Sequence, residues 1–422
     1  MKFHLVVFFI TVVLSFLVNY FLYGWWKKAG ILKNNNGPKL GLFLFGILPT
    51  LFLFGLFLFW FLLPVANSAG VYRWFSLFLL IFLLVFIPKV VFSLFILAQR
   101  PFKIDTSPTN PAEKQRHYPK LGRRKFLSQV GIIMATAPFV TLLFGALKGR
   151  YAFYTKHIRL SFPNLPAAFD GLHIVQISDL HLGSFGSNRE PLMEAFDLIN
   201  AEHPDIILFT GDIVNNFAAE MNGWESVFSK LKAPMGKYSI LGNHDYGNYS
   251  RWHSPKEKAD NFKGIVEGHS KLGFKLLNNQ GVKLERNGAV IGLAGVENWG
   301  KTSFPVNGDL HKAAAGLEDA PFRVLMSHDP DHWDARILEQ GFFDLTLSGH
   351  THGMQFGIEK GDFRWSPAQY VQKRWAGLFR EGDKYLYVNR GLGYLGMPAR
   401  VGMPPEITVI ELSRGPVGSE PM

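Results

Sequence analysis

Cysteine is absent from all 422 positions of the sequence, which excludes disulfide bonds and thiolate metal ligands. Acidic residues are nearly absent from the first 150 positions, which hold 2 of the 33 Asp and Glu residues but 17 of the 44 Lys and Arg residues. This part carries a formal charge of +15, whereas the 27 basic and 31 acidic residues that follow give −4. We therefore expect no nucleic-acid partner, despite the overall charge of +11, because the C-terminal part is mildly acidic.

Charged residues are also scarce in three long apolar stretches, at about 3–24, 40–64 and 74–97. Each is long enough to supply the ~20 residues that a membrane-spanning helix needs. A fourth stretch, 130–147, lacks charge but is rich in Ala, Gly and Thr, as signal-type segments often are. Lys89 lies beside Pro88 inside the third stretch. We interpret the pair as a kink whose lysine reaches for a headgroup, with a functional intramembrane site as the alternative.

The basic residues between these stretches predict the orientation of the chain, because Lys and Arg near the ends of spans stay on the cytoplasmic side. The second connecting loop contains only Arg73. The first and third loops contain Lys27, Lys28, Lys33 and Lys39, and Arg100, Lys103, Lys114, Arg116, Lys120, Arg123, Arg124 and Lys125. This pattern predicts an integral protein of the cytoplasmic membrane with its N-terminus outside. Four crossings then place everything after Arg150 outside the cytoplasm.

The segment Arg123-Arg124-Lys125-Phe126-Leu127 resembles a twin-arginine export signal, although an ordinary basic cluster is the alternative. Both interpretations place the following domain outside. The predicted organisation is three transmembrane helices in 1–100, a basic cytoplasmic linker with the twin-arginine-like motif in 101–129, a fourth transmembrane or signal-anchor helix in 130–150, and a folded domain in 151–422.

The C-terminal part alternates between β and α patterns, and metal-ligand residue types follow its strands. Short apolar runs at about 172–178, 205–210, 238–241, 322–327 and 344–348 are typical of buried strands. The clusters that follow them are Asp179-Leu180-His181, Gly211-Asp212-Ile213-Val214-Asn215, Gly242-Asn243-His244-Asp245, Ser327-His328-Asp329 and Gly349-His350-Thr351-His352-Gly353. Each cluster alone is a weak signal. Because the carboxyl ends of strands in an open α/β sheet form a common crevice, the five together predict one shared site.

The residue types in these clusters indicate which metals the site prefers. Carboxylate, imidazole and one carboxamide, without thiolate, suit Mn²⁺, Fe²⁺ or Fe³⁺, or Zn²⁺. Six or seven ligands exceed what one ion needs. The sequence therefore predicts two divalent metal ions that share a bridging carboxylate, about 3.5–4 Å apart, which is the arrangement used in phosphoryl chemistry. The glycines before Asp212, Asn243 and His350 are expected to let the backbone turn sharply after each strand.

The five motifs, in this order, resemble the calcineurin-like metallophosphoesterase superfamily over about residues 171–412, and in particular its membrane-anchored branch in bacteria and animals. The ending Val388-Asn389-Arg390-Gly391-Leu392-Gly393, followed by Pro405-Glu406-Ile407, resembles that branch as well. The resemblance implies an α/β fold, a four-layer α-β-β-α sandwich preceded by a helical transmembrane region. It also implies the role of each motif residue, which we carry over to the matching positions.

By this resemblance the first metal is held by Asp179, His181 and His352, the second by Asn243, His328 and His350, and Asp212 bridges them. His244 binds no metal and is expected to be the catalytic residue, stabilising the transition state and protonating the leaving oxygen. Asn215 stands where many relatives carry aspartate, which leaves the metal ligands unaffected. A water that bridges the two ions would become hydroxide near neutral pH and attack phosphorus in line.

We expect a phosphodiesterase that acts at the outer face of the membrane on a phosphoester carried by a lipid or another envelope component. Arg390 and Arg400 are candidate substrate-binding residues, with structural salt bridges as the alternative. The aromatic segment 246–262, which contains Tyr249 and Trp252, is interpreted either as a substrate-covering loop or as a packed surface loop. The competing functions are a UDP-2,3-diacylglucosamine-type pyrophosphatase, whose cytoplasmic substrate disagrees with the predicted topology, and a catalytically degenerate membrane sensor. The sequence does not predict the oligomeric state.

Overall fold

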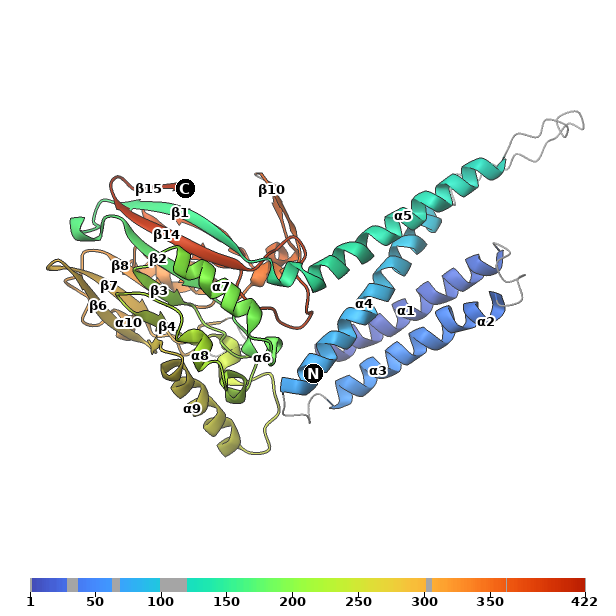
Figure 1. The fold of residues 1–422 in the computed structure, drawn as a ribbon, viewed down its shortest axis with the longest axis horizontal. Helices are drawn as coiled ribbons and strands as arrows, with labels where there is room; N and C mark the ends of the chain where they lie inside the picture. Colours follow the sequence, from blue (N-terminus) through green and yellow to red (C-terminus); the bar gives the residue numbers. More distant parts are fainter. Residues whose placement is uncertain are drawn as a thin grey trace, which may run out of the picture. The chain divides into compact units, whose positions relative to one another are not determined.

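The computed structural model describes residues 2–28, 37–62, 69–98, 120–300, 306–361 and 363–421. The chain divides into two compact units, and each is described by itself. One comprises Met1–Leu63 and Leu77–Phe144, and the other comprises Pro64–Ser76 and Gly145–Met422. Many elements of both are labelled in Figure 1. Residues 101–119 of the predicted basic linker, and with them Lys103, Lys114 and Arg116, lie outside the described residues.

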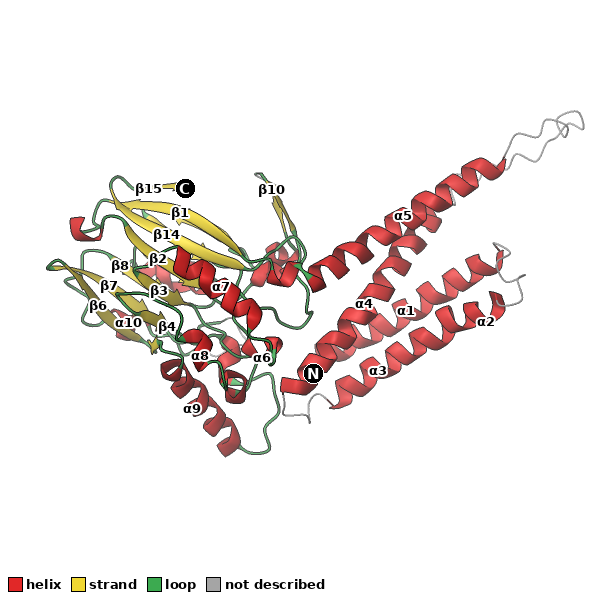
Figure 2. Cartoon of the chain, viewed as in Figure 1, coloured by secondary structure: helices red, strands yellow, loops and turns green. Residues whose placement is uncertain are grey.

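The C-terminal unit contains two large mixed sheets, drawn as yellow arrows in Figure 2. The first has the order β15 (Gly418–Pro421), β1 (Tyr154–Phe162), β14 (Glu406–Arg414), β2 (Leu172–Ile177), β3 (Ile206–Phe209), β4 (Lys237–Ser239) and β5 (Lys275–Leu276). The second has the order β12 (Gly377–Glu381), β13 (Lys384–Val388), β9 (Leu345–Ser348), β8 (Arg323–Met326), β7 (Ala289–Gly295) and β6 (Gln280–Arg286). A separate hairpin pairs β10 (Ile358–Lys360) with β11 (Phe363–Trp365).

Three apolar clusters define the layers of this unit. Side chains from both sheets, among them Leu160 and Val324, meet in a core between the sheets. The outer face of the first sheet is covered by α7 (Glu190–Ala201), α8 (Glu225–Phe228) and α9 (Pro255–Lys271), which contribute Phe196, Phe228 and Ile265. The second sheet packs its outer face against α10 (Leu310–Ala314) and a turn that contains Trp333. The predicted four-layer α-β-β-α sandwich is therefore confirmed.

All five predicted strands are present, as β2, β3, β4, β8 and β9. The strands β2, β3 and β4 run parallel to one another in the first sheet, and β8 and β9 run parallel in the second. Parallel strands present their carboxyl ends on the same edge of a sheet. Each of the five motifs therefore starts at the carboxyl ends of the strands in its sheet, within three residues of the end of its own strand.

The helical unit contains α1 (Lys2–Lys28), α2 (Gly37–Leu42), a π-helical turn (Phe43–Ile47), α3 (Leu48–Leu62), and most of α4 (Ala69–Ala98) and α5 (Lys120–Leu147). Two helical segments among the described residues, Ala69–Leu97 and Gln129–Tyr151, are long and apolar enough to cross a bilayer. Two shorter apolar helices cover Val12–Trp25 and Lys39–Gly55. Arg123 and Arg124 lie in the first turns of α5. Four crossings remain a prediction.

Lys89 lies within the helical unit, where its ammonium group has two polar partners. Its Nζ donates to Oδ1 of Asn19 on α1 at 2.9 Å and to the carbonyl oxygen of Leu44 at 2.8 Å. Leu44 belongs to the π-helical turn, which disturbs the regular helical hydrogen bonds and leaves carbonyl groups accessible to side chains. The ammonium group of Lys89 therefore forms hydrogen bonds inside the unit, where a contact with a lipid headgroup was predicted. These two acceptors reduce the cost of burying its charge.

Candidate metal centre

The structure brings the predicted ligands together in two adjacent groups. One contains Asp179, His181 and His352, all buried, and the other contains Asp212, His328 and His350. Within each group the ligand atoms lie within 4.8 Å of one another. Asn243 joins the second group, because its Oδ1 lies 2.7 Å from Nδ1 of His350. The seven residues lie in five loops. The first and the last of them, Asp179 and His352, are 173 positions apart in the sequence.

Many of these residues adopt a backbone conformation that L-amino acids avoid. Ten non-glycine residues in the described chain have positive φ, and five of them are proposed ligands: Asp179, His181, Asp212, His350 and His352. Such conformations each cost on the order of 1–3 kcal/mol and persist only where the surrounding structure imposes them. Their concentration here indicates that the fold stabilises a particular arrangement of donor atoms at some cost in stability.

The glycines that precede the ligands serve two different purposes. Gly211 has a φ of +97°, so it provides the expected sharp turn before Asp212. Gly242 and Gly349 do not have positive φ, so the predicted sharp turn is wrong for them. They are needed instead because a side chain at either position would collide with a carboxylate of the site. A Cβ atom on Gly242 would lie 2.1 Å from Oδ1 of Asp212, and one on Gly349 would lie 2.3 Å from Oδ2 of Asp179. Only glycine lets these loops approach the carboxylates so closely.

The carboxylate of Asp212 lies between the two groups. Its Oδ2 atom is 3.7 Å from Nε2 of His181 in the first group and 3.2 Å from Nε2 of His328 in the second. Its Oδ1 atom accepts a hydrogen bond from the backbone N–H of His244 at 2.9 Å. That contact fixes the rotation of the carboxylate, so one oxygen remains directed at imidazoles from both groups.

The imidazoles are oriented as metal-binding histidines usually are. Nδ1 of His181 lies 3.2 Å from the carbonyl oxygen of Val214, and Nδ1 of His328 lies 2.7 Å from that of Thr210. A ring nitrogen that donates to a carbonyl leaves the other nitrogen unprotonated in the neutral ring, ready to bind a metal. Nε2 of His328 is buried and lies 3.2 Å from Oδ2 of Asp212. This donor set fits divalent metal ions.

The charges of the site also favour a bound cation. Burial by itself would lower the pKa of His328, but the adjacent carboxylate of Asp212 outweighs it and raises the pKa to about 10. Burial would raise the pKa of Asp179, whereas the neighbouring His352 holds it below its usual value. The buried carboxylates of Asp179 and Asp212 therefore favour a positive charge beside them. A divalent ion would supply that charge.

His244 lies beside the two groups without belonging to either. Its Nδ1 atom is 2.8 Å from the carbonyl oxygen of Asn215, which requires a proton on Nδ1 and leaves Nε2 as the exchangeable position. The ring stacks on Tyr249 at a centroid distance of 4.3 Å and meets the edge of His181 at 4.9 Å. Burial lowers the pKa of His244. These contacts fix the ring beside the proposed ligands without using Nε2.

Sequence reasoning missed two carboxylates that support the loops of the site. Asp245 accepts hydrogen bonds from the backbone N–H groups of residues 212, 213, 214 and 242. Glu220 accepts four more, from residues 183, 215, 216 and 217. Asp245 could have been found from its position next to His244. Glu220 had no comparable signal, because it lies in a segment without a ligand motif.

The two candidate substrate-binding arginines occupy different environments. Arg400 is buried, and its guanidinium group donates to the carbonyl oxygens of Gly393, Met403 and Arg390 and lies 3.2 Å from Nδ1 of His352. Burial lowers its pKa to about 9. These contacts favour a structural role behind His352, so substrate contact by Arg400 stays a prediction without support from its hydrogen bonds.

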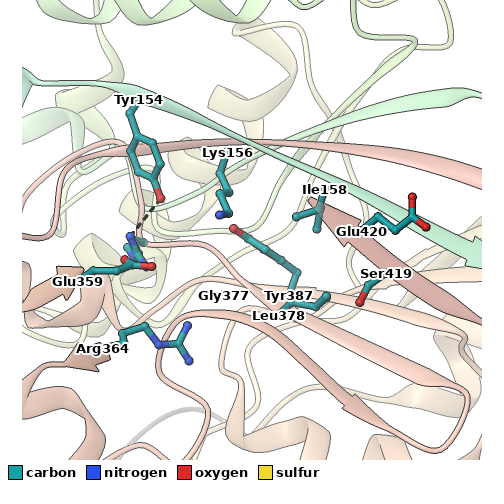
Figure 3. A pocket seen from close by; sticks show the side chains of 11 residues that line it. Tyr154, Lys156, Ile158, Glu359, Arg364, Gly377, Leu378, Tyr387, Ser419 and Glu420 are labelled. Atoms are coloured by element: carbon teal, nitrogen blue, oxygen red, sulfur yellow. Dashed lines mark hydrogen bonds and ion pairs between the residues drawn. The ribbon is translucent and has the colours of Figure 1, made fainter. Parts of the chain in front are cut away.

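Arg390 lines a cavity of about 250 Å³ between β1, β10, β11, β12 and β13, part of which is drawn in Figure 3. Its Nη1 donates to the hydroxyl of Tyr154 at 3.1 Å, its Nη2 pairs with Glu359, and its Nε lies 3.5 Å from Oε2 of Glu406. These partners make the structural salt bridge the better supported interpretation. A substrate contact by Arg390 remains a prediction.

The aromatic segment 246–262 packs against the domain. Trp252 donates from Nε1 to the carbonyl oxygen of Gly247 at 2.8 Å and meets the ring of Phe217 at 5.6 Å. Tyr249 is 42% exposed, and its hydroxyl accepts a hydrogen bond from Nδ2 of Asn243 at 2.7 Å. The segment therefore fits the packed-loop interpretation at Trp252, while Tyr249 holds the side chain of a proposed ligand.

Comparison with known proteins agrees with this geometry. The model of the calcineurin-like phosphoesterase family matches residues 172–354, which contain all five motifs, and a model described as the transmembrane domain of a probable calcineurin-like phosphoesterase matches residues 3–150. An uncharacterized metallophosphoesterase of Bacillus subtilis, YkuE, is 33% identical over 253 residues, which are 59% of this chain and 81% of that protein. The chain belongs to the calcineurin-like phosphoesterase family. As a metallophosphoesterase it is a phosphoester hydrolase, and the transmembrane match together with the two long apolar helices indicates a membrane protein.

Two further relatives have names that differ from that of YkuE and from each other. The transmembrane protein with metallophosphoesterase domain of Danio rerio is 29% identical over 265 residues, which are 61% of this chain but only 56% of that protein. The UDP-2,3-diacylglucosamine pyrophosphatase LpxG of Chlamydia muridarum is 27% identical over 300 residues, which are 59% of this chain and 85% of that protein. These similarities support the family and the type of chemistry. The substrate of this chain is a separate question.

Proposed function

We propose that this metallophosphoesterase hydrolyses phosphodiesters with two metal ions, chosen from Mn²⁺, Fe²⁺ or Fe³⁺, and Zn²⁺. The observation that carries the proposal is the position of Asp212, whose Oδ2 atom is directed at one imidazole from each ligand group. Asp179, His181 and His352 would hold one ion, and Asn243, His328 and His350 the other. A shared carboxylate between two complete donor sets is the arrangement that a dinuclear centre requires.

The chemistry of hydrolysis divides between the ions and the protein. Bound at these positions, the ions would supply Lewis acidity toward the phosphoryl oxygens and activate a water molecule. His244 would take up a proton at Nε2 from the attacking water and pass it to the leaving oxygen, because its Nδ1 proton is committed to the carbonyl of Asn215. Asp212 also orients the loop of His244 through the backbone N–H of that residue. No covalent intermediate with the protein is needed.

The proposed substrate is a phosphodiester that a lipid or another envelope component carries at the outer face of the cytoplasmic membrane. Its support is the combination of a membrane-spanning region with a loop-charge pattern that places the hydrolase domain outside. A transmembrane region holds the catalytic groups near a surface that is rich in phosphodiester headgroups. A soluble metabolite would not require that proximity.

Two other functions compete with this proposal. The likeness to a protein named UDP-2,3-diacylglucosamine pyrophosphatase favours a lipid-linked pyrophosphate as substrate. That substrate is cytoplasmic, so the reaction would require the opposite orientation. A catalytically degenerate sensor would have no use for His244, which is held beside the ligands without being one. The intact donor groups therefore favour an enzyme.

Substrate preference tests the proposed function. We expect the purified full-length protein with Mn²⁺ to have a kcat/KM at least about tenfold higher for a soluble aryl phosphodiester than for the matching monoester, a difference of about 1.4 kcal/mol in transition-state binding. A phospholipid in vesicles should also be hydrolysed. Initial rates on the three substrates measure both points. A higher kcat/KM for the monoester would contradict the diesterase proposal.

Reporter fusions test the proposed orientation. A reporter after residue 412 is expected to behave as extracytoplasmic, and one at about residue 110 as cytoplasmic, because the basic loops stay inside. The opposite result would favour the pyrophosphatase alternative. Replacing Arg123 and Arg124 together by lysine tests the export motif separately. Unchanged localisation of that variant would remove the twin-arginine interpretation and leave the topology intact.

A further inference from the structure

The hairpin β10–β11 and its flanks expose an unusual number of large apolar side chains. Between residues 354 and 371 these are Met354 (45% exposed), Phe356 (43%), Ile358 (54%), Phe363 (61%), Tyr370 (75%) and Val371 (63%). Soluble monomeric proteins scatter such residues singly, and a contiguous apolar patch usually marks a surface that is covered by a partner or a membrane. We call the described residues of this stretch, 354–361 and 363–371, the apolar hairpin.

The two faces of the hairpin are chemically different. Ile358 pairs with Trp365 and Lys360 with Phe363 across the strands, and Glu359 pairs with Arg364. Because side chains alternate along a strand, the first two pairs share one face and the third lies on the other. Glu359 and Arg364 line the cavity shown in Figure 3, so their face is turned toward the domain. The face with Ile358, Phe363 and Trp365 is therefore the outer one.

The hairpin is fixed to the end of the predicted fourth span. The C-terminal unit begins at Gly145, in the last turn of α5. The carbonyl oxygen of Gly145 accepts from the backbone N–H of Arg400 at 3.1 Å, and the carbonyl of Val401 accepts from the N–H of Gly357 at 2.9 Å. Phe356 forms a β-bridge with Val401. Gly145 permits this contact, because a Cβ atom there would lie 2.6 Å from the side chain of Val401.

The same turn of α5 lies at the predicted boundary of the membrane. The uncharged run of the span ends at Leu147 and is followed by Lys148 and Arg150. Gly145 lies two residues before that end, a rise of about 3 Å along a helix. We propose that the outer face of the apolar hairpin lies in the interfacial layer of the membrane that α5 crosses, with Phe363 and Ile358 among the acyl chains and Lys360 at the headgroups. Tyr and Trp residues are enriched in that layer, and lysine extends toward phosphates from it.

The position of the hairpin would bring the metal centre to the headgroups. The hairpin begins two residues after His352, and Oγ of Ser366, the residue after β11, donates to the carbonyl oxygen of Gly353 at 2.7 Å. Oγ1 of Thr351 donates to the carbonyl of Trp375 at 2.5 Å. A hairpin held in the lipid layer thus restrains the loop that carries His350 and His352. This consequence for lipid substrates rests on the proposed function, whereas the docking itself does not.

The absence of cysteine makes a direct test possible, because one introduced cysteine can be labelled without any background. The variants are Phe363→Cys on the hairpin and, as a matched control, Leu198→Cys, an exposed apolar residue of α7. Each full-length variant carries an environment-sensitive fluorophore and is reconstituted in vesicles of phosphatidylcholine and phosphatidylglycerol. Spin-labelled lipids quench a probe in the bilayer, and iodide quenches a probe in water.

We expect spin-labelled lipid to reduce the emission at position 363 at least twofold and iodide to have little effect, with the reverse at position 198. Quenching of position 363 by iodide alone would overturn the proposal. Protection of position 363 from both quenchers would also overturn it, because another copy of the chain or a different protein would then cover the hairpin. The readout does not depend on catalysis, so a failed activity assay and a failed docking proposal are distinguishable.

A double variant, Ile358→Ser with Phe363→Ser, tests the link to lipid substrates. We expect hydrolysis of a vesicle phosphodiester to fall about tenfold while the rate on a soluble aryl phosphodiester stays within about twofold. An unchanged rate on vesicles would overturn the effect of the hairpin on lipid hydrolysis. An equal loss on both substrates would also overturn it, because the hairpin would then support only the fold of the domain.

Discussion

Asp212→Asn is expected to lower the rate of phosphodiester hydrolysis by about 1000-fold or more and to reduce the metal content of the purified protein. The substitution keeps the shape of the side chain but removes the negative charge directed at both imidazole groups. A loss of roughly 4 kcal/mol in stabilisation of the metal-bound transition state corresponds to that factor. The amide would also place an N–H or a weaker acceptor opposite Nε2 of His328.

Metal analysis and initial rates on the same preparation measure this prediction. Asp309→Asn is the matched control: Asp309 caps α10 through a hydrogen bond to the N–H of Lys312, and asparagine caps a helix about equally well. We expect the control to retain both metal and rate. If Asp212→Asn kept wild-type metal content and activity, Asp212 would not bridge the ions.

His244→Ala is expected to keep the metal content of the wild type and to lower kcat by about 10²–10⁴-fold, the usual contribution of one general acid or base. The physical reason is that His244 lies in contact with His181 and Tyr249 but uses only Nδ1, for a backbone carbonyl. Its removal takes away the group that would transfer a proton to the leaving oxygen. It leaves all seven proposed ligands in place.

His311→Ala provides the control for this variant, since His311 is an exposed imidazole on α10. A comparison of substrates with different leaving groups makes the test sharper. The loss of a general acid should slow hydrolysis less when the leaving group needs no proton. Loss of one metal ion from His244→Ala would move His244 into the ligand set and contradict its assigned role.

The sequence predicted much of the site because its ligands are local in the chain. Each of the five clusters follows a short apolar strand, and parallel strands bring their carboxyl ends together without further information. Gly211 was interpreted correctly as a turn residue. Gly242 and Gly349 were not, because the space that they leave beside Asp212 and Asp179 depends on how separate loops approach one another.

Features that depend on tertiary contacts were beyond prediction from the sequence. Glu220 accepts four backbone hydrogen bonds, but no neighbouring motif distinguishes it from a surface glutamate. Arg400 was a candidate for substrate binding or for a structural role, and its burial among carbonyl groups behind His352 could not be read from the sequence. Lys89 was expected at a headgroup and instead bonds to Asn19 and Leu44, since a partner 70 residues away cannot be read from local composition.

The aromatic segment 246–262 is a further example. The sequence left open whether it covers the substrate or packs on the surface of the domain, and the structure packs Trp252 on Phe217. The apolar hairpin shows its character only when the strand pairing is known. Pairing places Ile358 and Phe363 on the face opposite Glu359 and Arg364. Register, which decides the face of every side chain in a strand, could not be derived from these short segments.

Two metal ions at Asp212 and its neighbours are proposed to carry out phosphodiester hydrolysis. This is tested by measuring bound metal and the rate on a soluble aryl phosphodiester together, for wild type, Asp212→Asn and His244→Ala, after chelation and after return of Mn²⁺. We predict that chelated wild type is inactive and regains its rate as about two ions bind, that Asp212→Asn regains neither, and that His244→Ala regains the ions without the rate. Full activity of the chelated wild type, or recovery complete at one ion, would contradict the account.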